Sequence, residues 1–469
     1  MSVVVLSIVA RHLDRSDFGL FAISQTFLQI VQIFLLSGLS TYVIYRTAGA
    51  DDQEEKQEIA LAAFWLNIFL SMGVIVIVAV GAPFWARFYH DPRIEEILYL
   101  LMLIFFFSQI GTIPVALLQK DYRYQRFVPV QMAIGTLYQV GQAVLAVRGF
   151  GVFSLIYPQL VLIPIQSFII LYLSPLRVRF QLHVRRWKEI YRYTKFLIGS
   201  TFLNAIVGRA DKLIIGKILG NEWLGVYDIG RRYAHLAMDY FLPMVGTIFF
   251  PLLSQYATDL ERLRFYFRRM IQLAGVAAFV ILTTQLAFAH DIIYGLPGPQ
   301  WKDAVPIMAL FSMYLMTRLI SSPSTQIYLA MGRPQIGLYF VAGFALVFVP
   351  VFFWAAHYGI WAATLAFVLL RMMGSGVHFV IASRLLKQTV REVYGDVGVL
   401  IGLGILQGWI FFWLSPETAF PYRVVAFAVL MTIEGLVIYR KMLRAEIFEI
   451  IALFRRRFAK SNGNDALTL

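Results

Sequence analysis

The sequence lacks cysteine and is poor in charged residues. None of its 469 residues is Cys, and Asp, Glu, Lys and Arg together make up 14% of the chain. The absence of cysteine excludes disulfides, thiolate metal sites and cysteine nucleophiles. Soluble chains carry about 25% charged residues, whereas 59% of this chain is hydrophobic. The composition therefore predicts a membrane protein that crosses the bilayer several times.

Apolar blocks of about 20 residues follow one another along the chain. Blocks of this length cross a hydrocarbon core of about 30 Å as helices, whereas barrels show alternating segments of about ten residues. The predicted fold class is thus an all-α polytopic membrane protein. We expect fourteen spans, at 1–13, 18–45, 59–86, 94–118, 127–147, 150–174, 196–218, 223–251, 270–290, 303–331, 335–356, 359–383, 396–414 and 421–439.

The formal net charge of +14 is spread unequally over the predicted loops. Connections on one side of the membrane hold 27 Lys and Arg residues, and those on the other side hold 8. Cytoplasmic loops are the ones enriched in Lys and Arg. We therefore expect a multi-pass protein of the inner (plasma) membrane with both termini in the cytoplasm. The positive charge needs no nucleic-acid partner to explain it.

The two halves of the chain resemble each other. Ala10–Phe21 aligns with Gly216–Tyr227 at an offset of 206, and the offsets from Gly151 to Gly359 and from Pro114 to Pro323 are 208 and 209. Six helices is an even number, so both copies have one orientation in the membrane, with a cavity expected between them. We predict two parallel six-helix repeats plus two C-terminal helices. The expected parts are an N-terminal lobe at 1–174 with a truncated first helix, a basic cytoplasmic linker at 175–195, a C-terminal lobe at 196–383, helices 13 and 14 at 384–439, and a basic cytoplasmic tail at 440–469.

The predicted linker contains seven basic residues together with Trp187 and two tyrosines. It is either a topology determinant lying along the membrane surface as an interfacial helix, or a segment that contacts anionic lipid headgroups. Both interpretations stay open at this point.

The first predicted span is short. It has 13 residues, whereas a full span needs about 20. The repeat places Ala10 over Gly216, which lies twenty residues after the start of the seventh span near Phe196. We expect translation to begin upstream of Met1; the alternative is a short or re-entrant first helix.

Four motifs occur in a fixed order and carry a family resemblance: ARHLDRSDFGL from Ala10, GLST from Gly38, IPVALLQKDYRY from Ile113 and DKLIIGKILG from Asp211. Together they resemble the polysaccharide-transport family of the MOP exporter superfamily. That resemblance implies a Wzx-type flippase, which moves undecaprenyl-pyrophosphate-linked oligosaccharide repeat units across the bacterial inner membrane. We also expect coupling to H+ or Na+, no cofactor, and membrane lipid, a polysaccharide polymerase and glycosyltransferases as partners.

Six basic residues lie inside the predicted spans, where each costs at least about 2.5–3.5 kcal/mol unless it is paired or hydrated. Guanidinium groups bind phosphate through two parallel hydrogen bonds and stay charged when desolvated. The candidate substrate-binding residues are Arg209, Arg231, Arg318 and Arg371; Lys212 and Arg232 complete the six.

Structural interpretations of these charges remain open. Asp228 would neutralise Arg232, and Asp211 would neutralise Arg209. Arg318 and Arg371 have no acid within one turn of their own helix, so each is either an anion ligand or paired with another helix through a residue such as Glu434. The first lobe instead carries neutral amides in its spans, including Gln25, Gln29, Gln32, Gln131, Gln139 and Gln142. We therefore expect a cavity with one amide-lined wall and one cationic wall.

Candidate ion-coupling residues are Asp211, Asp239 and His235, because a buried acid between arginines can exchange a proton or Na+ as its surroundings change. A histidine in a membrane helix is alternatively a packing residue that donates a hydrogen bond, and this applies to His235 and to His378.

Three other functions were compared with transport of lipid-linked glycans. A polymerase or ligase would need catalytic or metal-binding motifs, and no nucleophile elbow, metal-ligand spacing or Gly-rich phosphate loop is found in the sequence. The chain is therefore predicted not to be an enzyme. A drug exporter of the same superfamily would favour an acidic or apolar cavity for cationic drugs. A scaffold that recruits glycosyltransferases would use only the basic segment 175–195.

Overall fold

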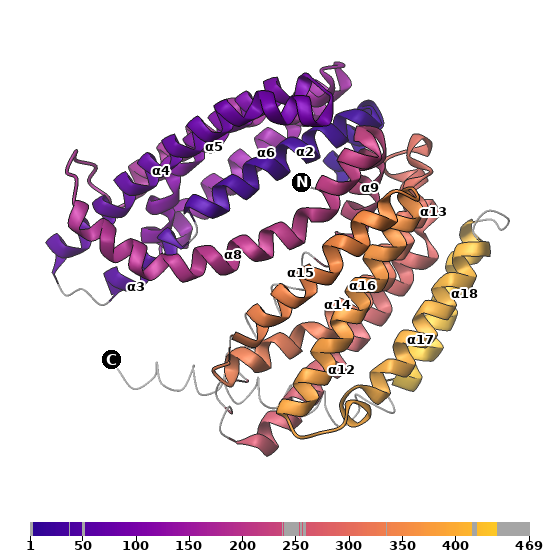
Figure 1. The fold of residues 1–469 in the computed structure, drawn as a ribbon. Helices are drawn as coiled ribbons and strands as arrows, with labels where there is room; N and C mark the ends of the chain where they lie inside the picture. The colour runs from indigo at the N-terminus through magenta and orange to yellow at the C-terminus, as the bar shows by residue number, and fades with distance from the viewer. Residues whose placement is uncertain are drawn as a thin grey trace, which may run out of the picture. The chain divides into compact units, whose positions relative to one another are not determined.

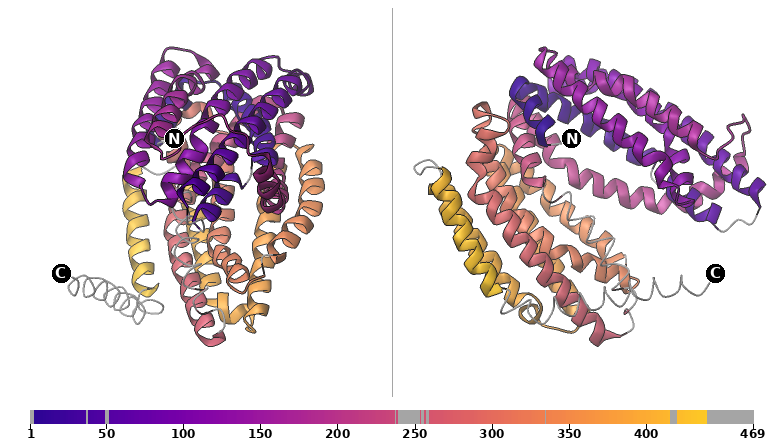
Figure 2. Two further views of the ribbon diagram at one scale, coloured as in Figure 1. Left: turned by 90° about the vertical axis from the view of Figure 1, so that its left-hand side faces the viewer. Right: turned by 180° about the vertical axis from the view of Figure 1, so that it is seen from behind.

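The computed structural model describes residues 3–36, 38–48, 52–236, 259–333, 335–414 and 420–438, together with the single residues 238, 253 and 256. These residues form helices joined by turns, and no strand occurs among them. Figures 1 and 2 show the arrangement from three directions. The predicted tail at 440–469 lies outside the described residues.

The helices follow one another closely along the chain. The first ten elements are α1 (Val3–His12), α2 (Arg15–Leu36), α3 (Leu39–Ala48), α4 (Gln53–Tyr89), α5 (Arg93–Lys120), α6 (Tyr124–Val147), η1 (Gly151–Leu155), α7 (Tyr157–Leu173), α8 (Val184–Ile218) and α9 (Gly220–His235). The remaining elements are α12 (Leu260–Ala287), α13 (Ala289–Gly295), η3 (Pro299–Trp301), α14 (Ala304–Ala330), α15 (Gln335–Ala356), α16 (Ile360–Leu385), α17 (Val390–Leu414) and α18 (Phe420–Ile438).

Eight helical segments in the described part of the chain are long and apolar enough to cross a membrane. They comprise α4 to α6, the segment from η1 to α7, α12, and α14 to α16. Their length and composition agree with an all-α polytopic membrane protein, as predicted. The expected number of fourteen spans stays a prediction.

The structure differs from the predicted spans at Gly38. The sequence predicts one span over 18–45, but α2 ends at Leu36 and α3 begins at Leu39. Gly38 has φ +92°, a left-handed conformation that only glycine adopts without strain. Apolar residues continue on both sides of the break, so hydropathy alone does not reveal it.

The helix α8 begins inside the segment predicted as a linker. It starts at Val184 and runs for 35 residues to Ile218. The second half of the predicted linker is therefore continuous with the helix predicted over 196–218. The domain boundaries proposed from the sequence stay a prediction.

Two compact units can be distinguished, and each is described by itself. Unit 1 comprises Met1–Leu236, Ile292–Phe311 and Pro334–Arg371, and unit 2 comprises Ala237–Asp291, Ser312–Arg333 and Met372–Leu469.

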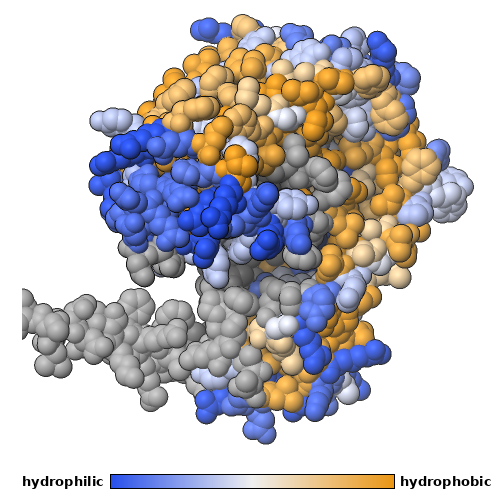
Figure 3. All heavy atoms as spheres, turned by 60° about the vertical axis from the view of Figure 1, so that its left-hand side comes forward, coloured by the Kyte–Doolittle hydropathy of each residue, from blue (hydrophilic) through white to orange (hydrophobic). Residues whose placement is uncertain are grey.

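In unit 1, α4 and α5 pack along each other, and α5 also packs against α7 (Figure 1). Their apolar core continues to α8, where Ile190 and Trp187 pack against Ile59 and Ala63 of α4. The opposite face of α4 is an exposed apolar row with a four-residue spacing, formed by Met72, Val76, Val80 and Phe84. Figure 3 shows hydrophobic side chains over much of the helix surface on the face it presents. An apolar exterior of this kind is suited to lipid rather than water.

The helices α2 and α9 of unit 1 cross in close contact through two glycines. A Cβ atom on Gly19 would overlap the carbonyl oxygen of Asn221, and a Cβ atom on Gly225 would overlap the carbonyl oxygen of Arg15. Gly19 and Gly225 are 206 residues apart, and so are Arg15 and Asn221. This is the offset at which Ala10–Phe21 aligns with Gly216–Tyr227, so each glycine meets a residue of the other predicted repeat.

The backbone carries further signs of the repeat. Residues with left-handed conformation occur in pairs at nearly one offset: His90 with Gly298, Tyr122 with Gly332, and Gly151 with Gly359. Their offsets are 208, 210 and 208 residues, close to the offsets found in the sequence. The turns that join successive helices thus recur along the chain, which supports the predicted repeat of helix order.

In unit 2, α12 packs along α17. Glycines of α17 make this approach possible, because a Cβ atom on Gly408 would lie 2.8 Å from the side chain of Leu286 and one on Gly404 would lie 2.5 Å from that of Thr283. At α18, the guanidinium of Arg423 donates two hydrogen bonds to Asp291, at 3.0 and 2.8 Å. Arg423 is 6% exposed and the side chain of Asp291 is 25% exposed, so the pair is largely shielded from solvent.

Candidate substrate-binding site

A group of charged side chains lies between α8 and α9 in unit 1. The group consists of two adjacent rows. Asp211 of α8 contacts Tyr227 and Arg231 of α9, and the next residue, Lys212, contacts Asp228 of α9. In the first row, Asp211 of α8 accepts hydrogen bonds from the hydroxyl of Tyr227 at 2.9 Å and from the guanidinium of Arg231 at 2.5 Å. Asp211 and Tyr227 are fully buried. One carboxylate thus holds the positions of both partners on α9.

In the second row, the acid is on α9. Asp228 accepts from Lys212 of α8 at 2.5 Å and from Arg232 at 2.6 Å. The carboxylate is 1% exposed, so two cations share one buried negative charge. The predicted pairing of Asp228 with Arg232 is confirmed, while the role of Lys212 was not foreseen.

Arg209 has a different partner from the one its neighbourhood in the sequence suggested. Its Nε donates to Oε1 of Gln29 on α2 at 2.9 Å, and the nearby Asp211 is bonded to Arg231 instead. Residues two apart on a helix point in different directions, and Arg209 and Asp211 form no direct ion pair in the described residues. Gln29 is one of the amides predicted to line the cavity.

Arg371 of α16 lies among aromatic rings. Its guanidinium carbon is 4.9–5.3 Å from the ring centres of Phe344, Phe348 and Phe367, and Nη2 donates to the carbonyl oxygen of Val207 at 3.1 Å. The guanidinium of Arg231 lies 6.0 Å from the same Phe367 ring. Two of the predicted substrate ligands therefore share one aromatic surface.

Other predicted site residues lie elsewhere. Arg318 belongs to unit 2, where its side chain is exposed and donates to the hydroxyl of Tyr314 at 2.9 Å. Glu434, considered as a partner for the isolated arginines, lies 2.7 Å from the side-chain amide of Gln407. Asp239 lies outside the described residues.

The two histidines make hydrogen bonds within their own surroundings. Nδ1 of His235 lies 3.0 Å from the carbonyl oxygen of Arg231, and its ring packs on Phe311. In unit 2, the Tyr328 hydroxyl donates to the carbonyl oxygen of His378 at 3.1 Å. These contacts agree with the packing interpretation and leave ion coupling by His235 as a prediction.

A cavity of about 180 Å³ adjoins Arg232 in unit 1. Its polar lining consists of Gln25, Tyr138, Gln142, Gln159 and Arg232, and its apolar lining of Phe18, Phe21 and Leu155. The amide nitrogen of Gln142 donates to the carbonyl oxygen of Leu155 at 3.0 Å, whereas its buried Oε1 has no hydrogen-bond donor in the described residues. An acceptor in that position is available to a ligand.

This cavity brings together Gln25 and Gln142, two of the amides predicted to line a cavity, and Arg232, one of the basic residues inside the predicted spans. The sequence analysis did not identify Tyr138 and Gln159 as cavity residues. Gln159 is a polar residue inside an apolar span, and that pattern indicates a position facing a cavity. Gln32, Gln131 and Gln139 are not among the lining residues. The amide wall is thus smaller than expected.

The described residues of the α8–α9 region and α16 hold more positive than negative charge. Arg209, Lys212, Arg231, Arg232 and Arg371 are five cations, and Asp211 and Asp228 are two carboxylates. Such an excess inside a membrane protein is costly unless an anion or water compensates it. The arrangement is suited to binding an anionic group.

Residues 8–306 match the family described as polysaccharide biosynthesis protein. The chain belongs to this family. A teichuronic acid biosynthesis protein of Bacillus subtilis is 23% identical over 321 residues, which are 68% of this chain and 65% of that protein. The lipopolysaccharide biosynthesis protein WzxC of Escherichia coli is 21% identical over 453 residues, 93% of this chain and 85% of that protein. The predicted family is therefore confirmed.

Solved structures show the same fold. The lipid II flippase MurJ in an inward closed conformation gives a TM-score of 0.74 at 11% identity and covers 94% of this chain and 97% of MurJ. An inward-facing multidrug resistance transporter of the MATE family and MOP superfamily gives 0.69 at 16% identity and covers 82% of this chain and 93% of the transporter. The fold is thus that of MOP-type transporters.

Proposed function

We propose that the protein is a flippase for undecaprenyl-pyrophosphate-linked oligosaccharides in the bacterial inner membrane, serving the synthesis of exopolysaccharide, capsule or O-antigen. The observation that carries the proposal is the excess of cations over carboxylates around α8, α9 and α16 in a polytopic member of a polysaccharide biosynthesis family. A pyrophosphate would add negative charge beside these cations.

The pyrophosphate ligands are proposed to be Arg209, Arg231, Arg318 and Arg371, the residues singled out from the sequence. Guanidinium suits this role because it donates two parallel hydrogen bonds and stays charged out of water. The guanidinium groups of Arg231 and Arg371 lie over one phenylalanine ring, which restricts the positions of both. Preorganised donors lose less conformational entropy on binding.

The amide-lined cavity is proposed to receive part of the glycan. Amides, a tyrosine hydroxyl and a guanidinium offer both donors and acceptors to sugar hydroxyls, and Phe18 and Phe21 offer aromatic surfaces. At about 180 Å³ the cavity is smaller than the about 300–1,000 Å³ of sites for drug-sized ligands. It therefore suits a single sugar ring rather than a whole repeat unit.

Transport is proposed to follow alternating access between the two repeats, with release outside. Asp211, His235 and Asp239 are the candidates for coupling to H+ or Na+. Asp211 supports this role because its other oxygen, Oδ1, is buried and has no hydrogen-bond donor in the described residues. Both termini are proposed to be cytoplasmic, beside the polymerase and glycosyltransferases of the same process.

A flipping assay tests this function. The purified protein would be reconstituted into liposomes containing a lipid-linked oligosaccharide, and the fraction accessible to a membrane-impermeant lectin would be followed over time. We expect protein-dependent growth of that fraction. Export of a cationic dye without glycan movement would instead indicate a drug exporter, and polymer assembly that survives without any flipping would indicate a scaffold.

A further inference from the structure

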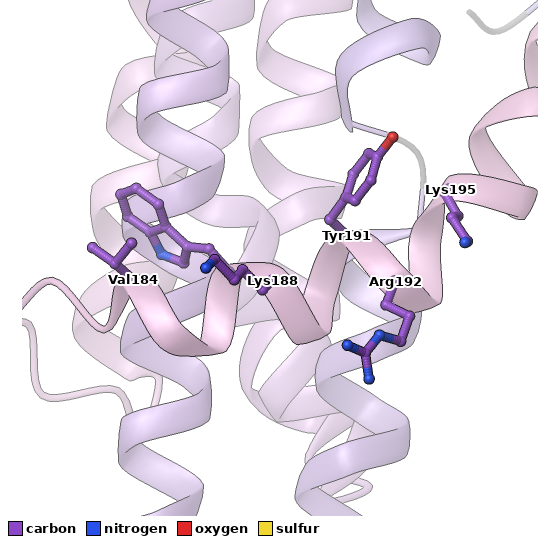
Figure 4. A pocket seen from close by; sticks show the side chains of 6 residues that line it. Val184, Lys188, Tyr191, Arg192 and Lys195 are labelled. Atoms are coloured by element: carbon purple, nitrogen blue, oxygen red, sulfur yellow. The ribbon is translucent and has the colours of Figure 1, made fainter.

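The first three turns of α8 present an exposed face outside the substrate site (Figure 4). A shallow hollow of about 570 Å³ lies along this face. The residues that line it recur with helical spacing and are Val184, Trp187, Lys188, Tyr191, Arg192 and Lys195. We call this surface the basic face of α8.

The edge of this face at Trp187 and the side behind it are tied to α4. The guanidinium of Arg186 forms ion pairs with Glu58 at 3.2 Å, Glu189 at 3.4 Å and Glu55 at 3.5 Å. The hydrogen bond to Glu58 raises the pKa of Arg186 above its ordinary value. The indole N–H of Trp187 donates to the carbonyl oxygen of Ala62 at 3.0 Å. These contacts fix the rotation of the helix and direct the basic face outward.

Two cations of the basic face, Lys188 and Arg192, lack such partners in the described residues. Lys188 and Arg192 are exposed and, within the part of the chain that the structure describes, form no ion pair. Glu189, the one acid between residues 175 and 195, is already used by Arg186. Residues 188, 192 and 195 lie along one side of the helix at spacings of four and three. The surface is therefore a row of positive charge on a fixed helix.

Apolar side chains share this surface. Tyr191 is 65% exposed and Val184 is 54% exposed, and Phe180 just before the helix is 72% exposed. Exposure of these apolar side chains to water is unfavourable, and transfer of the neighbouring cations into hydrocarbon is also unfavourable. The boundary between headgroups and acyl chains satisfies both kinds of side chain.

We propose that the basic face of α8 is a binding site for the headgroup of an anionic phospholipid of the inner leaflet. Its phosphate is held by Lys188 and Arg192, with Lys195 extending the row, and its upper acyl chain covers Val184 and Tyr191. Arginine and lysine bind phosphate oxygens strongly where water is partly excluded. The site is separate from the flipped substrate, and only its assignment to the inner leaflet rests on the membrane topology given under the proposed function.

Binding of a short-chain lipid to the full-length protein in detergent tests the site. The probe is dioctanoyl phosphatidylglycerol, with dioctanoyl phosphatidylcholine as the zwitterionic comparison and tryptophan fluorescence as the readout. We expect tighter binding of phosphatidylglycerol. The double variant Lys188→Gln/Arg192→Gln should weaken it about thirtyfold, on the basis of about fivefold per cation near a membrane surface.

A matched control removes the same charge elsewhere. Arg333→Gln/Lys387→Gln changes two cations in other connections predicted to be cytoplasmic and should leave the affinity unchanged. Tyr191→Ser should weaken binding without altering charge. The proposal is overturned if both double variants lose affinity equally, if neither does, or if inorganic phosphate displaces the lipid at comparable concentrations. Equal thermal unfolding of the variants and the wild type would show that the fold is intact.

Discussion

Single charged residues in unit 1 are arranged as linked pairs rather than as isolated ligands. Asp211 and Asp228 each join two partners across α8 and α9. Breaking a buried pair costs more than forming it contributes, because the remaining charge stays buried without compensation. Arg231, a proposed substrate ligand, is thus held in place by an acid that does not itself need to contact the substrate.

Substitution of Asp228 should reveal this support. Asp228→Asn leaves Lys212 and Arg232 without their shared carboxylate, and we expect a loss of about 3–5 kcal/mol in stability. Thermal unfolding in detergent measures it. The control Asp259→Asn removes an exposed carboxylate paired with Arg262 at 3.2 Å and should cost at most about 1 kcal/mol. Equal effects of the two changes would contradict a structural role of the buried pair.

Arg231 and Arg371, which lie over the ring of Phe367, should instead affect transport. Arg371→Ala is expected to reduce flipping at least tenfold, because it removes a phosphate ligand worth more than about 1.4 kcal/mol. Arg371→Lys should restore only part of the rate, since lysine lacks the planar fork that stacks on Phe367. Arg318→Ala should also impair flipping while the protein still inserts and folds.

The control for these arginine changes lies on the same helix as Arg371. Arg384→Ala removes an exposed guanidinium from the end of α16 and should leave the flipping rate unchanged. Unstable protein in both Arg318→Ala and Arg371→Ala would point to structural pairing rather than substrate binding.

At the scale of helices, the crossing of α2 and α9 is set by backbone contact. Gly19→Ala or Gly225→Ala would place a methyl group against a carbonyl oxygen, so the helices must separate. We expect a lower unfolding temperature for either variant. Gly73→Ala in α4 is a matched control, because a Cβ atom there meets nothing within 4 Å. It should be neutral or slightly stabilising, given the higher helix propensity of alanine. A similar loss of stability in all three variants would argue against the crossing.

The sequence predicted helices well where one physical signal dominates. Hydropathy located the apolar blocks of α4 to α7, and the four-residue spacing of Asp228 and Arg232 predicted their pair. Hydropathy did not predict the helix break at Gly38, because apolar residues lie on both sides of this left-handed turn. Nor did it predict that Asp211 bonds Arg231, since that contact depends on how two helices pack. The cavity lined by Gln142 and Gln159 joins residues from different helices for the same reason.

For the whole molecule, the distribution of Lys and Arg predicts which connections face the cytoplasm. The natural absence of cysteine makes this directly measurable, because a single introduced cysteine is the only thiol. Tyr358→Cys, in a predicted outer connection and 66% exposed, should react with a membrane-impermeant maleimide in intact cells. Arg333→Cys, in a predicted cytoplasmic connection, should react only after permeabilisation. The reverse labelling pattern would invert the proposed topology.

The glycine crossing also limits how this protein can evolve. At most packing contacts, an enlarged side chain can be compensated by a smaller neighbour in a second mutation. At Gly19 and Gly225 the neighbouring atoms belong to the main chain, so no substitution of the neighbour can make room for a larger side chain. A genetic selection for suppressors of Gly225→Ala should therefore yield changes that displace a whole helix, such as substitutions at the turn around Gly220, rather than changes in side chains at the contact. The two predicted repeats would then constrain each other, because the backbone of each would require the glycine of the other.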